Sequence, residues 1–320
     1  MTTQTAPFLH SAFEGDLGYS YIFAAQEIQE VLTDRMDLMQ LGVVPLVGDF
    51  AGTGTDPLRI THMGGVGWNL EAAALSSETD TITPSSLTTG YSSVALGFYG
   101  LGHDETYKHQ LLSREPAVML DQLKARVPQS FLATWRSVYV ATGATISTAV
   151  GSASAYNSVD DLLDFIAAYR ENPGSGRPKV TAHTVQGTKL LESARNEPAF
   201  QAAAATMQSQ QAMGDSMQML PNFLGLGVDF ALTNEVGQSA SAYQGFGHAM
   251  GGIGWAVCST AALKTSNPAG TILIPDYGIV VEEVSDGTRQ TIRGYEARFA
   301  FGMALGDTSV HLLRRFIGKV

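Results

Sequence analysis

The residues of this chain that could do chemistry are few and scattered. The densest group is His103, Asp104, Glu105 and His109, in which two imidazoles and two carboxylates could hold a metal ion. Histidines that share a metal on one helical face are four residues apart, whereas these two are six apart and would diverge. We therefore favour a helix start, with the two acidic residues in its first turn, over a metal site.

A second acidic group, Asp160, Asp161 and Asp164, is typical of a helix N-terminus, where carboxylates favour the helix dipole. Catalytic carboxylates are the remote alternative. No nucleophile elbow G-x-S-x-G occurs, and no complete G-x-G-x-x-G, Walker A, H-E-x-x-H or C-x-x-C motif occurs. The sequence therefore predicts no catalytic residue, no cofactor and no metal ligand.

The charge pattern excludes one class of function. The net charge is −11, and the only basic cluster is the pair Arg314 and Arg315. A protein that recognises nucleic acid neutralises phosphates with a basic face, so direct recognition is not expected. Only 15% of the residues are charged, which favours a subunit that buries its faces against neighbours over a lone monomer.

The chain shows no sign of secretion or membrane insertion. Cys258 is the only cysteine, so no intrachain disulfide is possible, and its apolar surroundings predict a small buried side chain. The first fifteen residues lack the basic and apolar regions of a signal peptide. The longest uncharged stretches, Ser137–Val159 and Val236–Leu263, are too rich in small polar residues for a membrane span. We expect a soluble protein made in the cytoplasm.

The elements that would position these residues begin with an amphipathic helix at Tyr19–Gln40. A long Gly/Ser/Thr-rich section, 42–102, follows; its strands are predicted at Asp56–His62, Thr79–Thr83 and Tyr91–Tyr99. A structureless loop of this length would be unusual in a compact domain, so the section predicts an extended β-excursion that another subunit stabilises. Thr106–Leu112 is predicted as a helix. Ser113 then caps a long helix, Arg114–Val140, with Pro116 in its first turn, Pro128 as a kink, and an apolar face that includes Val127, Phe131 and Trp135.

The second half mixes helices and strands after a small, polar linker at Thr142–Tyr156. Ser158 and Asp161 form a capping box that opens a helix at Val159–Arg170. The further predictions are a strand at Lys179–His183, helices at Thr188–Ala194 and from Pro198 to Gly214, a strand at Gly227–Thr233, a buried helix at His248–Leu263, and a hairpin of Thr271–Val284 with Arg289–Met303 around Asp286-Gly287. The fold class predicted is α+β.

This order of elements resembles the tailed-bacteriophage major capsid protein, the Johnson fold, along essentially the whole chain. The resemblance rests on the order and lengths of the elements and on the segments Asn157–Ile166, Pro178–His183, Thr188–Glu192, His248–Ile253 and Gly302–Asp307. It implies an N-terminal arm and helix (1–41), an extended β loop (42–102), a spine helix with peripheral domain (103–156), an axial domain (157–264), and a closing peripheral hairpin with tail (265–320).

The resemblance also implies partners. The subunit would assemble with itself into hexamers and pentamers, enclose DNA without specific recognition, avoid membranes, and work with a separate scaffold, portal or decoration protein. In the extended loop, Trp68 and Glu71 would contact a neighbouring subunit, with ordinary loop residues as the alternative. Some members of the family cross-link through a lysine on this loop, but residues 42–107 contain none, so non-covalent joints are expected.

Two other functions remain open from the sequence. An encapsulin-like compartment shell would have the same fold and enclose protein in place of DNA. An α/β enzyme with a non-standard site would need a convergent pocket of titratable groups, which the scattered His and Asp positions do not offer.

Overall fold

We describe the fold from a computed structural model of the chain. The structure describes residues 21–35, 43–48, 58–63, 89–106, 118–170, 178–211, 217–233, 238–239, 242–248, 252–264, 271–284, 291–306 and 313–319. Its helices are α2 (Tyr21–Arg35), α4 (Val118–Gly143), α5 (Val159–Arg170), α6 (Thr184–Asn196), α7 (Gln201–Gln211) and α8 (Thr260–Leu263), with short 3-10 turns η2 (Phe223–Gly225) and η3 (Pro275–Tyr277). The described elements combine these helices with sheets whose strand pairs are mostly antiparallel, and the predicted α+β class is confirmed.

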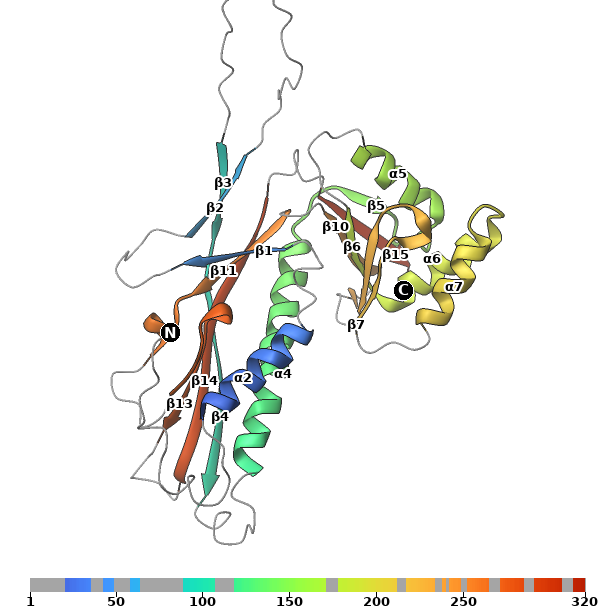
Figure 1. The fold of residues 1–320 in the computed structure, drawn as a ribbon. Coiled ribbons are helices and arrows are strands. Elements are labelled where there is room, and N and C mark those ends of the chain that lie inside the picture. Colours follow the sequence, from blue (N-terminus) through green and yellow to red (C-terminus); the bar gives the residue numbers. More distant parts are fainter. Residues whose placement is uncertain are drawn as a thin grey trace, which may run out of the picture.

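The described strands form three sheets. The first has the order β1-β11-β14-β13-β12, with β4 also paired to β14. Its strands are β1 (Val44–Gly48), β4 (Gly97–Thr106), β11 (Ile253–Cys258), β12 (Thr271–Ile274), β13 (Ile279–Val284) and β14 (Thr291–Leu305). The third sheet is the antiparallel pair β2 (Leu58–Met63) and β3 (Thr89–Val94), which projects from one end of the first sheet (Figure 1).

The second sheet has the order β5-β15-β10-β6-β8-β7, with β9 on β10. Its strands are β5 (Ala149–Gly151), β6 (Lys179–Ala182), β7 (Met217–Leu220), β8 (Asp229–Thr233), β9 (Gln238–Ser239), β10 (Ala242–His248) and β15 (Arg314–Lys319). It mixes parallel and antiparallel pairs, since β6 runs parallel to β8 and antiparallel to β10.

The long helix α4 lies along one face of the first sheet, with α2 beside it (Figure 1). Helical spacing brings Val127, Phe131 and Trp135 to one side of α4, and all three are fully buried, as the sequence predicts. Facing them, alternate residues of β14 point inward, among them Phe299 and Phe301. The Phe131 ring meets Phe299 edge-on at 5.3 Å between centroids, so aromatic packing joins helix to sheet.

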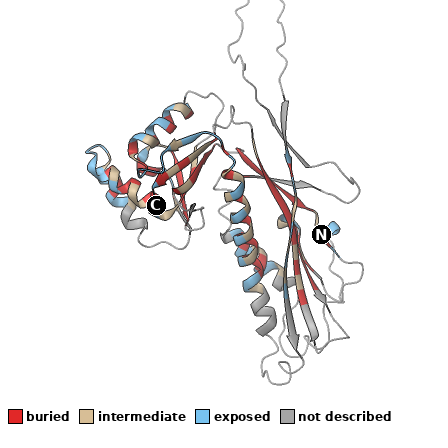
Figure 2. Ribbon diagram, turned by 180° about the vertical axis from the view of Figure 1, so that it is seen from behind, coloured by how far each residue is buried: buried red, intermediate tan, exposed pale blue. Residues whose placement is uncertain are grey.

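The second sheet and helices α5, α6 and α7 enclose a core of their own. Helix α5 contributes Leu162 and Phe165, α6 contributes Leu191, and the strands contribute Val180 and Phe230. Figure 2 shows buried residues following the strands of both sheets, while the outward sides of the helices are exposed. The first sheet and the second sheet therefore each pack against their own helices around a separate hydrophobic core.

Several sequence predictions need correction. The predicted helix at His248–Leu263 is wrong, because strand β10 ends at His248, β11 spans Ile253–Cys258, and only Thr260–Leu263 is helical. A continuous apolar run has no period that separates a buried strand from a buried helix. The predicted linker Thr142–Tyr156 contains strand β5, and the predicted strand Thr271–Val284 is two strands, β12 and β13, around η3.

Other predictions hold with adjusted limits. Helix α5 has the predicted bounds, and β13 pairs antiparallel with β14 as the predicted hairpin requires. The predicted strand at 79–83 and the caps Ser113 and Pro116 lie outside the described residues. Strand β11 joins the first sheet and β15 joins the second, so both pair across the predicted domain limits. The domain limits themselves stay a prediction.

Candidate assembly surfaces

Some of the residues that the sequence singled out for function lie outside the described part of the chain. Trp68, Glu71 and His109 lie outside the described residues. His103 and Asp104 belong to β4, where they pair with Tyr295 and Gly294 of β14, so the predicted helix start is wrong. Within the described part of the chain, no group of three or more His, Cys, Asp or Glu residues could hold a metal ion.

One of the three aspartates of α5, Asp161, takes part in a helix cap. A carboxylate oxygen of Asp161 accepts hydrogen bonds from the Ser158 backbone N–H at 2.8 Å and from its hydroxyl at 3.2 Å. The Asp161 N–H in turn donates to the Ser158 hydroxyl at 3.3 Å, which completes the predicted capping box. Asp160 and Asp164 are exposed on the same helix, so these carboxylates do not converge on a common site.

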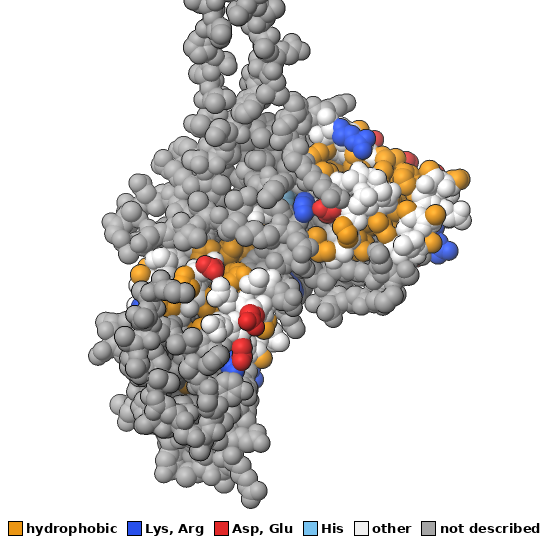
Figure 3. All heavy atoms as spheres, viewed as in Figure 1, with side chains coloured by type: hydrophobic (Ala, Val, Ile, Leu, Met, Phe, Trp, Pro, Cys, Tyr) orange, Lys and Arg blue, Asp and Glu red, His pale blue; other side chains and the backbone are white. Residues whose placement is uncertain are grey.

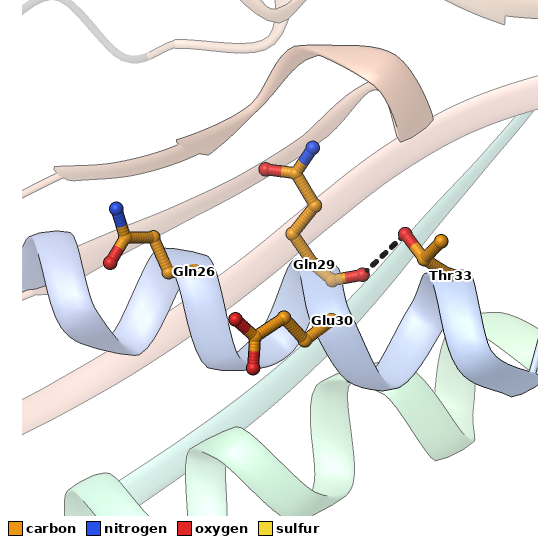
Figure 4. Close-up of a pocket in the computed structure, with 4 residues that line it drawn as sticks. All are labelled: Gln26, Gln29, Glu30 and Thr33. Carbon is orange, nitrogen blue, oxygen red and sulfur yellow. Dashed lines mark hydrogen bonds between the residues drawn. The ribbon is translucent and has the colours of Figure 1, made fainter.

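A shallow groove of about 570 Å³ runs along α2 and is lined by Gln26, Gln29, Glu30 and Thr33 (Figure 4). The Thr33 hydroxyl donates to the Gln29 carbonyl at 2.8 Å and lies 3.2 Å from the Tyr277 hydroxyl of η3. The Gln29 amide donates to Asp276 at 2.9 Å. These bonds fix α2 against η3. Among the described lining residues Glu30 is the one carboxylate, and these residues offer no acid–base pair.

The C-terminal end of α4 contacts the second sheet through five residues that we call the junction: Tyr139, Gly143, Thr181, Phe246 and His248. The Tyr139 hydroxyl lies 3.0 Å from Thr181 Oγ1 and 2.9 Å from His248 Nε2, and its ring meets Phe246 edge-on at 6.0 Å. Burial raises the pKa of Tyr139, so its hydroxyl stays protonated at neutral pH. One turn later Gly143 is buried, and a Cβ there would lie 2.6 Å from the Phe246 ring. The junction therefore depends on a glycine that lets helix and strand approach closely.

Beside the junction, an ion pair crosses the second sheet. Lys179 of β6 pairs in register with His248 on one side and with Asp229 on the other, and Lys179 Nζ lies 3.3 Å from Asp229 Oδ2. The other Asp229 oxygen accepts the Asn222 backbone N–H at 2.9 Å. Both partners are largely buried, and a buried charge is tolerated when it is paired and hydrogen-bonded. The pair thus fixes strand positions in the sheet.

The face of the first sheet that points away from α4 carries a charged cluster. Arg298 Nη1 donates to Glu282 Oε2 at 2.7 Å, and Nη2 donates to Glu296. The Glu282 side chain is nearly fully buried, whereas Arg298 and Glu296 are partly exposed. Alongside, Phe98 of β4 is 73% exposed, the largest exposure among the described large hydrophobic residues.

The strand register places two glycines of β4 against this cluster. Gly100 pairs with Arg298, and Gly102 pairs with Glu296. We call Phe98, Gly100, Gly102, Glu296 and Arg298 the outer strip. The sequence prediction missed it because the predicted strand ended at Tyr99, although the two-residue spacing of Phe98, Gly100 and Gly102 was available as a signal.

A second hollow, of about 490 Å³, lies between α7 and the turn around Asn222 and is lined in part by Ala203, Thr206, Met207 and Met219. Figure 3 shows isolated acidic and basic side chains among apolar and uncharged ones on the described part of one face. None of the described helices is long and apolar enough to cross a membrane.

No family model matches the chain, and no curated protein matches its sequence. Solved structures do match. The acid-stable capsid structure of Helicobacter pylori bacteriophage KHP30 matches with a TM-score of 0.55 and 9% identity over 86% of this chain and 86% of that chain. The cyanophage Pam1 capsid matches at 0.51 and 10% identity, covering 87% and 89%, and the capsid of an empty GTA particle matches at 0.51 and 11% identity, covering 89% and 90%. The chain has the fold of these capsid subunits, and the predicted Johnson fold is confirmed.

Proposed function

We propose that this chain is the major capsid protein of a tailed bacteriophage, a structural subunit that self-assembles into the icosahedral shell around the genome. One observation carries the proposal: the chain shares its fold over at least 86% of its length with three subunits whose structures are capsids.

The chemistry of the chain supports a structural role over an enzymatic one. The described lining of the groove on α2 includes no acid–base pair, Asp161 belongs to a helix cap, and Asp229 is held in an ion pair. With a net charge of −11, an inner wall of this protein would enclose DNA without gripping it. Hexamers and pentamers of the chain itself are the proposed partners, together with a separate scaffold, portal or decoration protein.

The domain division belongs to the same proposal. The second sheet with α5, α6 and α7 would be the axial domain, and the first sheet with α4 the peripheral domain. Strand pairing supports moving two segments relative to the sequence-based limits: β11 goes with the peripheral sheet, and β15 with the axial sheet.

In the extended loop we propose that Trp68 and Glu71 contact a neighbouring subunit. Aromatic anchors at interfaces often contribute about 2 kcal/mol or more. Trp68→Ala should therefore lower the denaturant concentration at which shells dissociate, while the unassembled subunit keeps its melting temperature. Loss of the subunit's own stability with no defect specific to assembly would place Trp68 in an internal core.

The joints between copies are proposed to be non-covalent, because residues 42–107 contain no lysine and Cys258 is buried. Particles boiled in denaturing detergent without reductant should run as one band near 34.0 kDa. A ladder of multiples that survives this treatment would show covalent linkage.

The decisive experiment is electron microscopy and size-exclusion chromatography of the expressed protein, alone and with a scaffold from the same source. We expect rings or closed shells. Shells that hold protein and exclude DNA in their native host would indicate a compartment, and a monodisperse small oligomer under every condition would contradict the proposal.

A further inference from the structure

A partly buried histidine, His183, joins the second sheet to helix α6. Its imidazole stacks on the ring of Tyr243 in β10, with the two centroids 4.3 Å apart and the planes 23° from parallel. On the helix side, Nδ1 accepts the backbone N–H of Val185 at 3.2 Å, so His183 is the N-cap residue of α6. We call His183, Tyr243 and Val185 the histidine clamp. It connects the end of β6 to β10 and to the first turn of α6.

The hydrogen bond of the clamp requires a neutral imidazole. A backbone N–H can only donate, so Nδ1 of His183 must accept and the ring proton must be on Nε2. A protonated imidazole carries a hydrogen on both nitrogens, so neither orientation of the ring could accept the N–H of Val185. Protonation would also place a positive charge at the N-terminus of α6, which the helix dipole disfavours. Both effects oppose the clamp in acid.

The charged side chains on the elements around the clamp do not offset that positive charge. On α6, Lys189 pairs with Glu192 at 2.8 Å, and across β6 and β8 Lys179 pairs with Asp229 at 3.3 Å. The exposed Lys319 of β15 adds a further cation to the same sheet. The group that faces the imidazole from β10 is the phenol ring of the clamp, which is neutral in acid. The described carboxylates on these elements are thus already engaged with lysines.

One interaction acts in the opposite direction, because a protonated imidazole over the Tyr243 ring would gain a cation–π contact. Burial outweighs it and lowers the pKa of His183 below its ordinary value of 6.5. The folded state therefore binds this proton less readily than the unfolded state. The clamp contributes its full stability above about pH 6.5 and loses it as the pH falls below that value.

The first turn of α6 is the part of the helix that depends on the clamp. In this turn Gln186 is buried and donates to Asn157, and a side chain on Gly187 would overlap Leu232 of β8. The turn therefore lies directly on the second sheet. Later turns are anchored separately, for example through the buried side chain of Leu191. Loss of the clamp should open the first turn while the later turns stay packed.

We propose that His183 is an acid-sensitive switch within the subunit: protonation of its imidazole releases the first turn of α6 from β6 and β10. The switch is a property of the folded chain and does not depend on assembly into a shell. Mild acid would loosen the helix layer of the second sheet, whereas the first sheet has a separate core and would keep its packing.

Hydrogen exchange of the purified full-length chain tests the switch. Mass spectrometry would measure the amides of Val185 and Gly187 at about pH 7.5 and about pH 5, with correction for the intrinsic exchange rate at each pH. The protection of these amides should fall by about threefold or more in acid. His183→Asn supplies an amide oxygen that caps the helix and does not titrate, so its protection should be the same at both pH values.

A second histidine variant separates the switch from a general effect of acid. His103→Asn removes a histidine from β4 in the first sheet and should leave the acid response of α6 unchanged. An equal loss of protection in His183→Asn would assign the response to other groups and overturn the proposal. Equal protection of the unchanged protein at both pH values would overturn it as well. If His183→Asn does not fold, His183→Ser, which also caps helices, provides the same comparison.

Discussion

The junction and the outer strip both contain glycines, but the surroundings of these glycines differ. At the junction, Gly143 is buried against the Phe246 ring, and its missing side chain is matched by a close internal neighbour. In the outer strip, Gly102 faces open space as far as the described residues extend. The glycine at the junction is therefore matched by a close neighbour, whereas the described residues show no such neighbour at Gly102.

The polar groups follow the same division. The Tyr139 hydroxyl is hydrogen-bonded within a fully buried cluster, so the junction is complete in the isolated subunit. Arg298 and Glu296 are paired yet remain partly in solvent, beside an aromatic ring that is 73% exposed. Contacts that are buried and completed within the subunit should govern its stability. Side chains that remain exposed should matter more for its association.

The largest effect on the subunit is expected from Gly143→Val at the junction. The new side chain would overlap the Phe246 ring and force the end of α4 away from β10, which we expect to lower the free energy of unfolding by about 3 kcal/mol. Urea unfolding of the unassembled subunit measures it. Ala141→Val, an exposed position in the same helical turn, is the control and should change little. Equal midpoints for the two variants would contradict the assigned contact.

Arg298→Met tests how much the ion pair between Arg298 and Glu282 contributes to the stability of the subunit. It leaves the buried Glu282 carboxylate without its guanidinium partner, and we expect a loss of about 2 kcal/mol. Adding Glu282→Gln should recover part of that loss in a double-mutant cycle. Additive losses from the two changes would show that the pair contributes no coupling.

Tyr139→Phe removes one hydroxyl from the junction and keeps the ring packing against Phe246. Thr181 and His248 each lose that hydrogen bond, and we expect the free energy of unfolding to fall by about 1 kcal/mol. Tyr156→Phe on the exposed surface provides the matched comparison. A variant as stable as the unchanged protein would mean that the hydroxyl does not hold the two layers together.

The smallest effect on the subunit is expected from Phe98→Ser. Because the ring is mostly in solvent, the free energy of unfolding of the subunit should change by no more than about 0.5 kcal/mol, so its melting temperature should move little. The yield of shells, in contrast, should fall clearly. Differential scanning fluorimetry of the subunit and electron microscopy of the particles give the two readouts. A large loss of subunit stability with normal assembly would reverse the comparison between strip and junction.

Local signals accounted for the parts of the fold that the sequence could predict. The Ser158–Asp161 capping box fixed the start of α5, and the three-to-four spacing of Val127, Phe131 and Trp135 identified the buried face of α4. The helix predicted at His248–Leu263 was wrong because small and apolar residues occupy nearly every position of this run. The spacing of its apolar residues therefore could not distinguish a helix from a strand.

The functional surfaces depended on pairings that no local signal contains. The Tyr139 hydroxyl meets partners 42 and 109 residues away, and the outer strip exists because β14 aligns Arg298 with Gly100. Trp68 and Glu71, chosen through the family resemblance, stay a prediction. The fold class and the element order were readable from the chain, whereas the assignment of glycines to internal or external contacts needed coordinates.

The place of β14 and β15 in the sheets has a consequence for the order of events during synthesis. Strand β15 lies between β5 and β10, and β4 finds its partner in β14, nearly two hundred residues later in the chain. Neither sheet can close until those late segments have left the ribosome. The register that aligns Arg298 with Gly100 thus forms only in chains translated past residue 298, so the first sheet is completed late in synthesis.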